Sequence, residues 1–289
     1  MNRNLERNAM KWMGIFVVAL AASVILLSGK AGANTFEDES QASMARSFDL
    51  SAGVSSITYT EPHFMKEEGL FYGLNASYTE RSPQHMMGAL EGRFAIGQVD
   101  YSSNGTGTLD DIQDWTGEAR VLGGYDFFAL SETRLTPYIG LGYRYLSDQS
   151  GGMTSTTGAS GYDRESNYVY LPIGLKTITK LGDDWTLGFT IEYDNLLWGK
   201  QKSHLEDVDP TVDPIENKQN GGYGLRGSMQ ITRTMTETVD LVFEPYFKYW
   251  NIDASDIKSI TISGTPTGLA GQEPANHSTE YGMNLGLHF

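Results

Sequence analysis

The sequence predicts an all-β protein: a membrane-spanning, antiparallel, up-and-down β-barrel of ten strands, with eight or twelve as the alternative strand counts. Three observations predict this fold. Long stretches alternate bulky apolar residues with small or polar ones, the connections between them alternate between short and long, and a basic and then apolar segment opens the chain. Alternation with period two is the pattern of a β-strand whose two faces meet different surroundings.

The N-terminal segment is typical of a secretory signal. Arg3, Arg7 and Lys11 precede the apolar run 13–28, which ends close to Ala31 and Ala33, at the small-residue positions that a signal peptidase needs. The apolar run is slightly short for a membrane helix, which needs about 20 residues. We therefore predict a cleaved signal peptide (1–33), a short periplasmic segment (34–46) and one barrel domain (47–289); an uncleaved anchor is the alternative.

Composition excludes several classes of protein. The formal net charge is −15, and removal of the basic signal makes the chain more acidic still, which argues against a nucleic-acid partner because phosphate binding needs basic patches. The chain has no cysteine, so disulfides and a lipid-modified cysteine are excluded. The mean hydropathy of −0.34 would suit a soluble protein. It suits a membrane barrel equally well, because only one face of each strand contacts lipid.

The alternating stretches are long. Soluble strands average about 5–6 residues, whereas a tilted membrane strand needs about 9–11. In the first stretch the apolar parity slips between Val54 and Ile57, and we expect a β-bulge there. The ten predicted strands are 48–60, 69–79, 87–101, 115–128, 137–146, 167–177, 185–194, 222–232, 239–251 and 280–289.

The connections between these strands are sorted by length. Outer-membrane barrels have short periplasmic turns and longer outside loops, and an even strand count leaves both termini in the periplasm. The pattern therefore predicts a bacterial outer-membrane protein with both termini periplasmic. The short connections are 81–84, 131–134, 181–184 and 234–238, and the long ones are 61–68, 102–113, 149–165, 200–219 and 254–276.

The last strand carries a family resemblance. Its alternating Tyr281, Met283, Leu285, Leu287 and C-terminal Phe289 resemble the β-signal of bacterial outer-membrane proteins. The resemblance implies that the barrel-assembly machinery and outer-membrane lipid are partners, and that the chain is similar to the opacity-protein and OmpA-like class. This strand is expected to pair with the first, because an open edge cannot persist in hydrocarbon.

The inward positions of the predicted barrel are charged. An eight-stranded barrel has room only for side chains, and larger barrels open a channel. We expect Arg120, Arg144 and Arg226 to pair with Glu118, Glu192 and Glu244, giving a lumen held by ion pairs and a structural or interaction role; a small, porin-like pore and a catalytic use of the charges are the alternatives. The predicted lumen network is Glu91, Arg93, Glu118, Arg120, Arg144, Lys176, Glu192, Asp194, Arg226, Glu244 and Lys248.

The long loops indicate no cofactor and no metal. Asp207, Asp209 and Asp213 cluster in an acidic loop, but the calcium-loop pattern with its glycine and closing glutamate is absent. Neither a phosphate-binding glycine motif nor a paired-histidine metal motif occurs. We expect solvated loops that are available to an extracellular ligand.

A second resemblance gives an enzymatic alternative. The stretch 170–199 is similar to the hairpin of omptin proteases that precedes a catalytic Asp–His couple. The resemblance implies a water-activating site of His204 and Asp207, with Asp209 nearby, facing Asp111 and Asp114 beside Asp110. The order departs from the family, because omptins have Asp-x-His and here the histidine precedes its acids. Whether the chain is an enzyme is left open, with a non-enzyme favoured.

Overall fold

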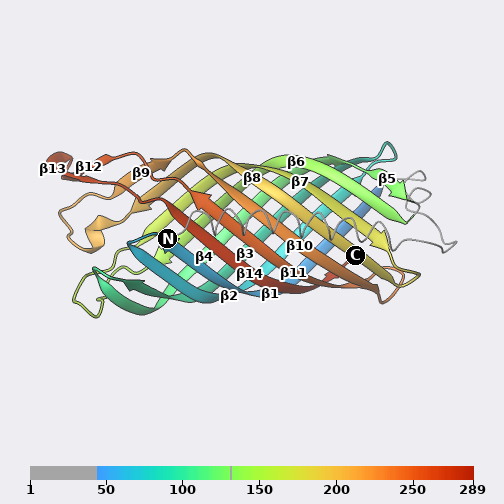
Figure 1. The fold of residues 1–289 in the computed structure, drawn as a ribbon, viewed down its shortest axis with the longest axis horizontal. Coiled ribbons are helices and arrows are strands. Elements are labelled where there is room, and N and C mark those ends of the chain that lie inside the picture. Colours follow the sequence, from blue (N-terminus) through green and yellow to red (C-terminus); the bar gives the residue numbers. More distant parts are fainter. Residues whose placement is uncertain (1–43, 131) are drawn as a thin grey trace.

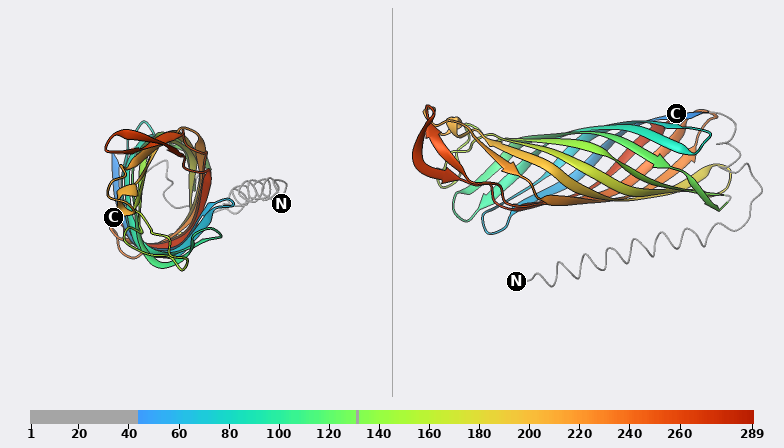
Figure 2. Two further views of the ribbon diagram at one scale, coloured as in Figure 1. Left: turned by 90° about the vertical axis from the view of Figure 1, so that its left-hand side faces the viewer. Right: turned by 90° about the horizontal axis from the view of Figure 1, so that it is seen from above.

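The computed structural model describes residues 44–130 and 132–289, in which ten long antiparallel strands close into a barrel (Figures 1 and 2). The order around the barrel is β1-β2-β3-β4-β6-β7-β8-β10-β11-β14, and β14 returns to β1. The predicted signal peptide, and the periplasmic segment up to residue 43, lie outside the described residues. Among the described residues, no helix combines the length and the apolar character needed to cross a membrane.

The strands are longer than predicted, mainly at one end. Four short strands and a 3-10 helix, η1 (Leu205–Asp207), lie in the connections: β5 (Phe127–Leu130), β9 (Ile215–Gln219), β12 (Lys258–Ile262) and β13 (Thr265–Gly271). The barrel strands are β1 (Ala45–Glu61), β2 (Met65–Arg81), β3 (Met86–Ser103), β4 (Gly107–Tyr125), β6 (Thr133–Gln149), β7 (Arg164–Lys180), β8 (Trp185–Ser203), β10 (Gly222–Thr234), β11 (Asp240–Ile252) and β14 (Asn276–His288).

The first and last strands close the barrel. Their register runs unbroken from Asp49 opposite His288 to Thr60 opposite His277. At its end the Phe48 N–H donates to the Phe289 carbonyl oxygen at 3.0 Å, and the Phe289 N–H donates to that of Phe48 at 2.9 Å. No edge of the ten-strand sheet is left unpaired, so the backbone polar groups are satisfied within the wall.

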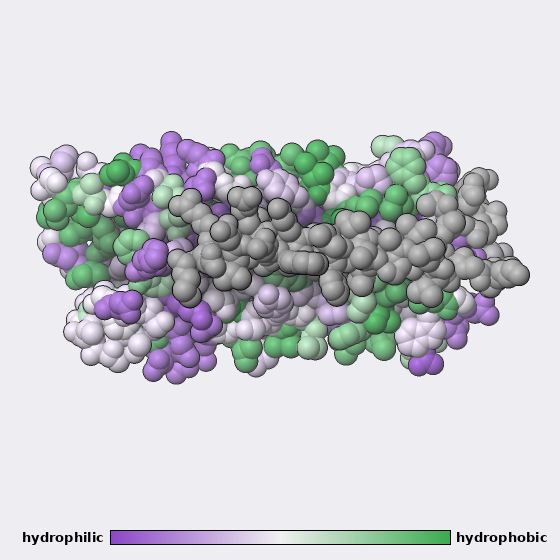
Figure 3. Space-filling model, viewed as in Figure 1, coloured by the Kyte–Doolittle hydropathy of each residue, from purple (hydrophilic) through white to green (hydrophobic). Residues whose placement is uncertain are grey.

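The outer wall carries an apolar band that ends at aromatic residues. Exposed apolar side chains such as Leu74, Leu90 and Leu141 face outward from the barrel strands. On the face drawn in Figure 3, hydrophobic residues lie along the middle of the barrel, with hydrophilic residues on either side of them. Trp115, Trp198, Tyr249 and Tyr281 lie at one border of this band, where aromatic rings suit the lipid–water interface. We call these four residues the girdle, and the membrane-spanning segments end there.

Beyond the girdle the strands continue as a rim with a hydrophilic outer surface. The outward residues of the rim include Lys66, Glu68, Gln98, Gln113, Glu165 and Lys200. The rim belongs to the end that carries β9, β12 and β13, opposite the C-terminus in Figure 1. We call this end the long-loop end and the other the short-turn end.

The predicted bulge in the first strand is wrong. The register of β1 is unbroken through Val54 and Ile57 with both neighbours, and the register shifts lie elsewhere, at Val99–Tyr101 and Val169–Tyr170. The apolar residues of β1 change from the outward to the inward face because the outer surroundings of the strand change from lipid to water. Inside the band Val54 faces lipid, whereas in the rim the outside is water, so Ile57 turns inward. It packs there against a cluster of Phe71, Ala95, Val99 and Ile112.

The loop lengths also differ from the prediction in detail. Segments 61–68 and 102–113 are mostly strand, because β1 to β4 extend into the rim and turn within three residues. The connections 150–163, 204–221 and 253–275 are long and share the same end, and the connections of the other end are short. Sorting of connections by end therefore holds, while two of the five predicted long loops are tight hairpins.

Deletion of Phe289 should lower the folded fraction of the protein in outer membranes. The deletion removes both closing hydrogen bonds with Phe48 and the ring contact between the two residues, whose centroids are 6.3 Å apart. The measurement is the heat-modifiable, fast-migrating band on a denaturing gel. Phe64→Ser is the control, because Phe64 is an exposed aromatic in a rim turn and is remote from the seam. Equal folded fractions for the deletion and the control would contradict the prediction.

Candidate functional site

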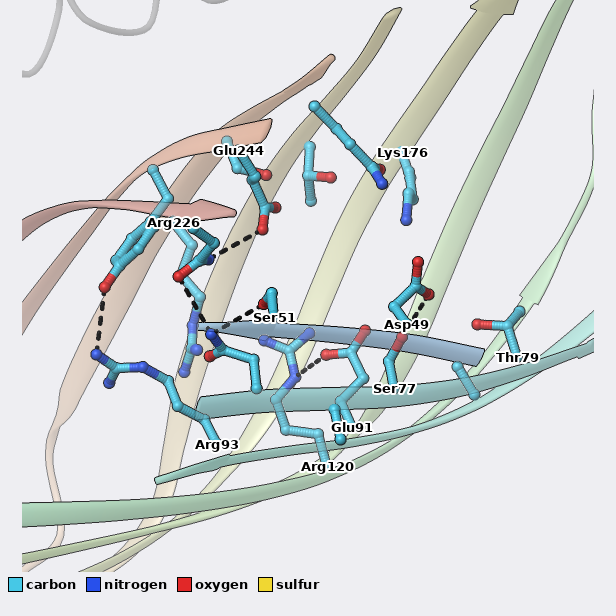
Figure 4. A pocket seen from close by; sticks show the side chains of 18 of the residues that line it. Asp49, Ser51, Ser77, Thr79, Glu91, Arg93, Arg120, Lys176, Arg226 and Glu244 are labelled. Atoms are coloured by element: carbon cyan, nitrogen blue, oxygen red, sulfur yellow. Dashed lines mark hydrogen bonds and ion pairs between the residues drawn. The ribbon is translucent and has the colours of Figure 1, made fainter. Parts of the chain in front are cut away.

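Three of the cavities in the described part of the lumen lie at successive levels. The largest of the three, about 240 Å³, lies toward the short-turn end and is lined by polar side chains including Asp49, Lys176 and Glu244 (Figure 4). A cavity of about 10 Å³ lies beside Arg144 and Trp250, and one of about 60 Å³ lies within the rim beside Asp114 and Arg164. The layers of side chains between these cavities form the candidate site.

Arg226 on β10 is the centre of the ionic layer. Its Nη2 and Nη1 donate to Glu118 Oε1 at 2.5 Å and Oε2 at 2.8 Å, across the lumen on β4. Its Nε donates to Asp194 Oδ2 at 2.6 Å and lies 3.1 Å from Glu192 Oε1, both on the neighbouring β8. The guanidinium is buried, and such a geometry offsets the cost of removing the charges from water.

A second arginine shares the same carboxylates. Arg120 on β4 makes a bidentate contact with Glu192, at 2.8 and 2.7 Å, and lies 3.1 Å from Glu91 (Figure 4 shows the Glu91 contact). The Tyr138 hydroxyl donates to Glu192 Oε2 at 2.7 Å. Lys248 Nζ lies 3.5 Å from Glu118 Oε2. Charges from five strands, β3, β4, β8, β10 and β11, thus form one connected network.

Sequence reasoning missed Glu280 in this layer. Arg93 forms an ion pair with Glu280, and the Tyr246 hydroxyl donates to Glu280 Oε1 at 2.7 Å. The signal was present, because Tyr281 faces lipid and the preceding residue must then face the lumen. Glu280 is the first residue of the C-terminal alternation, where the pattern alone does not separate a lumen residue from a loop residue.

Two expected pairings are not made. The Arg144 guanidinium lies 5.4 Å from the centre of the Trp250 ring and makes no ion pair within the described part of the chain. Its cross-strand neighbour Glu118 is already occupied by Arg226 and Lys248. Glu244 accepts a hydrogen bond from Asn284 Nδ2 at 3.1 Å rather than from an arginine, at the edge of the large cavity.

An aromatic layer covers the ionic layer on the side of the rim. Tyr170 and Trp250 are almost completely buried and meet edge to face, with ring centroids 5.1 Å apart. The Tyr170 hydroxyl donates to Glu118 Oε1 at 2.5 Å, so the two layers are joined. We call Tyr170, Trp250, Arg226 and Glu118 together the plug.

The rim encloses a second, more acidic group. Arg164 lies 3.1 Å from Glu61, 2.6 Å from Glu67 and 2.7 Å from Asp148, and the three carboxylates are buried. Asp114 and Glu273 complete what we call the acid chamber, in which five carboxyl groups face one guanidinium. Burial first, and then the neighbouring carboxylates, raise the pKa of Glu67 to about 8, of Asp114 to about 9 and of Glu273 to about 7.

The residues of the protease alternative do not come together. His204 Nε2 lies 3.0 Å from Glu165 Oε1, and its Nδ1 lies 2.9 Å from Glu206 Oε1. Burial lowers the pKa of His204, but these two hydrogen bonds outweigh it and the pKa lies above its ordinary value. A histidine whose two nitrogens are both engaged by glutamates is poorly placed to activate a water.

The acids of that alternative lie in three separate places. Asp207 Oδ2 accepts from the Asp163 N–H at 2.9 Å, Asp111 is exposed with a φ of 59°, and Asp114 lies in the acid chamber. The Asp207 N–H donates to the His204 carbonyl at 3.1 Å, but within residues 44–130 and 132–289 no hydrogen bond or ion pair joins any of the three carboxylates to the His204 imidazole. In the same residues no group of three or more potential ligands is arranged to hold a metal ion.

Comparison with known proteins identifies the fold. No family model and no curated protein matches the sequence. Among solved structures the outer membrane protease OmpT from Escherichia coli matches 86% of this chain and 97% of its own, with a TM-score of 0.59 and 13% identity. This chain therefore has the fold of bacterial outer-membrane β-barrels.

Other outer-membrane structures also match, with lower scores. The translocator domain of autotransporter NalP from Neisseria meningitidis covers 97% of both chains, with a TM-score of 0.40 and 9% identity. The outer membrane protein OprG from Pseudomonas aeruginosa covers 86% of this chain and 97% of its own, with a TM-score of 0.34 and 13% identity.

Arg226→Ala should lower the free energy of unfolding in detergent by about 3–5 kcal/mol, because it leaves Glu118 and Asp194 buried with reduced compensation. The measurement is denaturant unfolding followed by tryptophan fluorescence. Arg46→Ala is the control: Arg46 pairs with Glu80 on the exposed surface, where a salt bridge contributes at most about 1 kcal/mol. A loss for Arg226→Ala no larger than that for the control would mean that water reaches the network.

Proposed function

We propose that this protein is an outer-membrane barrel with a closed lumen, whose role is structural and interactive and is carried by its long-loop end outside the cell. The fold, the apolar band and the girdle support insertion in a membrane. The observation that carries the proposal is the division of the lumen by the plug. A transport protein needs a continuous path, and a protein that presents a surface does not.

The dimensions of the lumen favour a closed barrel and not an open pore. The cavity beside the plug has a volume of about 10 Å³. That is about the space that a single water requires, and is too small for a hydrated ion. Tyr170, Trp250 and Asp194 are each almost completely buried, so side chains rather than water fill this level. A small, charge-lined pore would require the plug to move.

The long-loop end provides the surface for interaction. It projects beyond the girdle and presents η1, β9 and the β12–β13 hairpin on a hydrophilic rim. Its orientation toward the outside follows from the rule that outer-membrane barrels keep short turns in the periplasm. Insertion by the barrel-assembly machinery, guided by the β14 residues Tyr281 to Phe289, belongs to the same proposal. A proteolytic role lacks an assembled site, and likeness of fold to a protease does not supply one.

Wild-type protein refolded in planar bilayers should give no defined single-channel steps. Tyr170→Ala/Trp250→Ala should give steps, because it removes the aromatic layer together with the hydrogen bonds of the Tyr170 hydroxyl that hold Glu118 and Arg226 across the lumen. The measurement is conductance in molar salt. Tyr72→Ala/Tyr78→Ala is the control, since it removes two aromatic side chains from the outer wall and should stay silent. Regular steps from the wild type would favour the pore over the closed barrel.

Single cysteines at the two ends should be labelled differently on intact cells. The chain contains no cysteine, so an impermeant maleimide reports one site at a time. Labelling is expected for Asp209→Cys and Thr267→Cys at the long-loop end and not for Asp183→Cys and Glu237→Cys at the short-turn end. All four should react once the outer membrane is permeabilised. Labelling of the second pair alone would reverse the orientation.

A further inference from the structure

The acid chamber has an unbalanced charge. It is faced by Tyr59 and Glu61 from β1, Glu67 from β2, Asp114 from β4, Asp148 from β6, Arg164 and Tyr168 from β7, Tyr162 from the connection before β7, and Glu273 from the connection before β14. Glu61, Glu67, Asp148 and Glu273 are at least nine-tenths buried. Five ionised carboxylates around one guanidinium would leave an enclosed net negative charge, which is costly unless protons are retained.

One of these carboxyl groups belongs to a segment outside the ten barrel strands. Glu273 lies in the connection 253–275, which includes the β12–β13 hairpin and which we call the flap. Its carboxyl lies within hydrogen-bonding reach of that of Glu61, and its Oε1 accepts from Gln201 Nε2 at 3.2 Å. The Glu273 N–H donates to Ser255 Oγ at 2.9 Å, and the Ser255 N–H donates to the Glu273 carbonyl at 3.0 Å. Glu273 therefore holds both ends of the flap on the rim.

The rest of the flap is hydrogen-bonded to segment 212–219. Asn217 Nδ2 donates to the Asp256 carbonyl at 2.8 Å, and Thr261 Oγ1 donates to Asp213 Oδ2 at 2.6 Å. This segment, 212–219, contains β9, which pairs within the barrel only with the end of β8. The β13 strand is exposed along almost its entire length, and its last residue, Gly271, accepts from Asn217 Nδ2 at 3.3 Å. Figure 2 shows the hairpin standing at the far end of the barrel.

We propose that the acid chamber is a pH-sensitive latch, which holds the flap on the rim while Glu273 and Glu61 share a proton and releases it when the carboxyl groups lose their protons. A protonated Glu273 donates to Glu61. An ionised Glu273 instead faces Glu61 and Asp148 as like charges, with Arg164 already engaged by other carboxylates.

The sign of the pH effect follows from proton linkage. In the closed state the pKa of Glu273 is raised to about 7, whereas a released, solvated glutamate titrates at about 4.3. The closed state therefore binds more protons between these two values, and the ratio of closed to open flap falls up to about tenfold per pH unit there. Loss of protons from Glu67 and Asp114, with pKa values of about 8 and 9, continues the trend at higher pH.

Two spin labels test the latch in the full-length protein in lipid. One is placed at Thr265→Cys, in the exposed hairpin, and the other at Asn104→Cys, in the tight turn between β3 and β4. Pulsed electron resonance should give one narrow distance distribution at about pH 5 and a broad one at about pH 9. Identical distributions at both values would overturn the proposal.

Glu273→Gln is the decisive variant. Its neutral amide has the shape of the protonated carboxyl, donates to Glu61 and accepts from Gln201, so the flap should stay narrowly distributed at both pH values. Glu216→Gln is the matched control, because Glu216 is an exposed acid on β9, and it should broaden at high pH as the wild type does. Broadening of Glu273→Gln equal to that of the wild type would overturn the latch. Both variants keep all barrel strands, and their folded fractions are compared by heat modifiability.

Discussion

The pairing of the first strand with the last is the interaction on which the rest of this protein depends. Hydrogen bonds between Phe48 and Phe289, and the continuous register above them, convert a sheet with two free edges into a closed wall. Hydrocarbon offers no partner to an exposed N–H or C=O, so only a closed barrel can keep its strands in the membrane. Closure also creates an interior that lipid does not reach, and the lumen charges are possible only there.

Within that interior, charge pairing takes the place of an apolar core. Arg226 and Arg120 join Glu118, Glu192, Asp194 and Glu91, while Arg93 joins Glu280. Because Arg226 and Arg120 each contact carboxylates on two strands, loss of one arginine affects carboxylates on more than one strand. The same contacts tie β4 to β8 and β10 across the lumen. The network therefore both braces the wall and blocks the passage, which connects the stability of the barrel to the closed function proposed for it.

The rim follows a different rule because its outer surface meets water. There the apolar residues Ile57, Phe71, Val99 and Ile112 turn inward, and the carboxyl groups of the chamber lie above them around Arg164. The membrane-spanning network distributes its acids among several basic groups, whereas the chamber has one guanidinium for five acids. This difference makes the rim the part of the molecule whose conformation should respond to protons, and it lies where the flap is attached.

The sequence by itself determined the fold class, the ten strands, the sorting of connections by end and the outward face of each membrane strand. These follow from period-two alternation, which depends only on neighbours along one strand. Tertiary structure decided which charges meet. Glu118 and Arg226 are 108 residues apart in the sequence and form an ion pair across the lumen. Arg144 lies against the Trp250 ring and not beside an acid. Glu280, which the sequence analysis did not place in the lumen network, pairs with Arg93. Strand registers and the tilt of the closed barrel determine which lumen side chains come within contact distance. The alternation of residues along one strand determines neither of them. The acid chamber could not be predicted from the sequence for the same reason. Its five carboxyl groups come from five separate segments, which become neighbours only in the folded rim around Arg164.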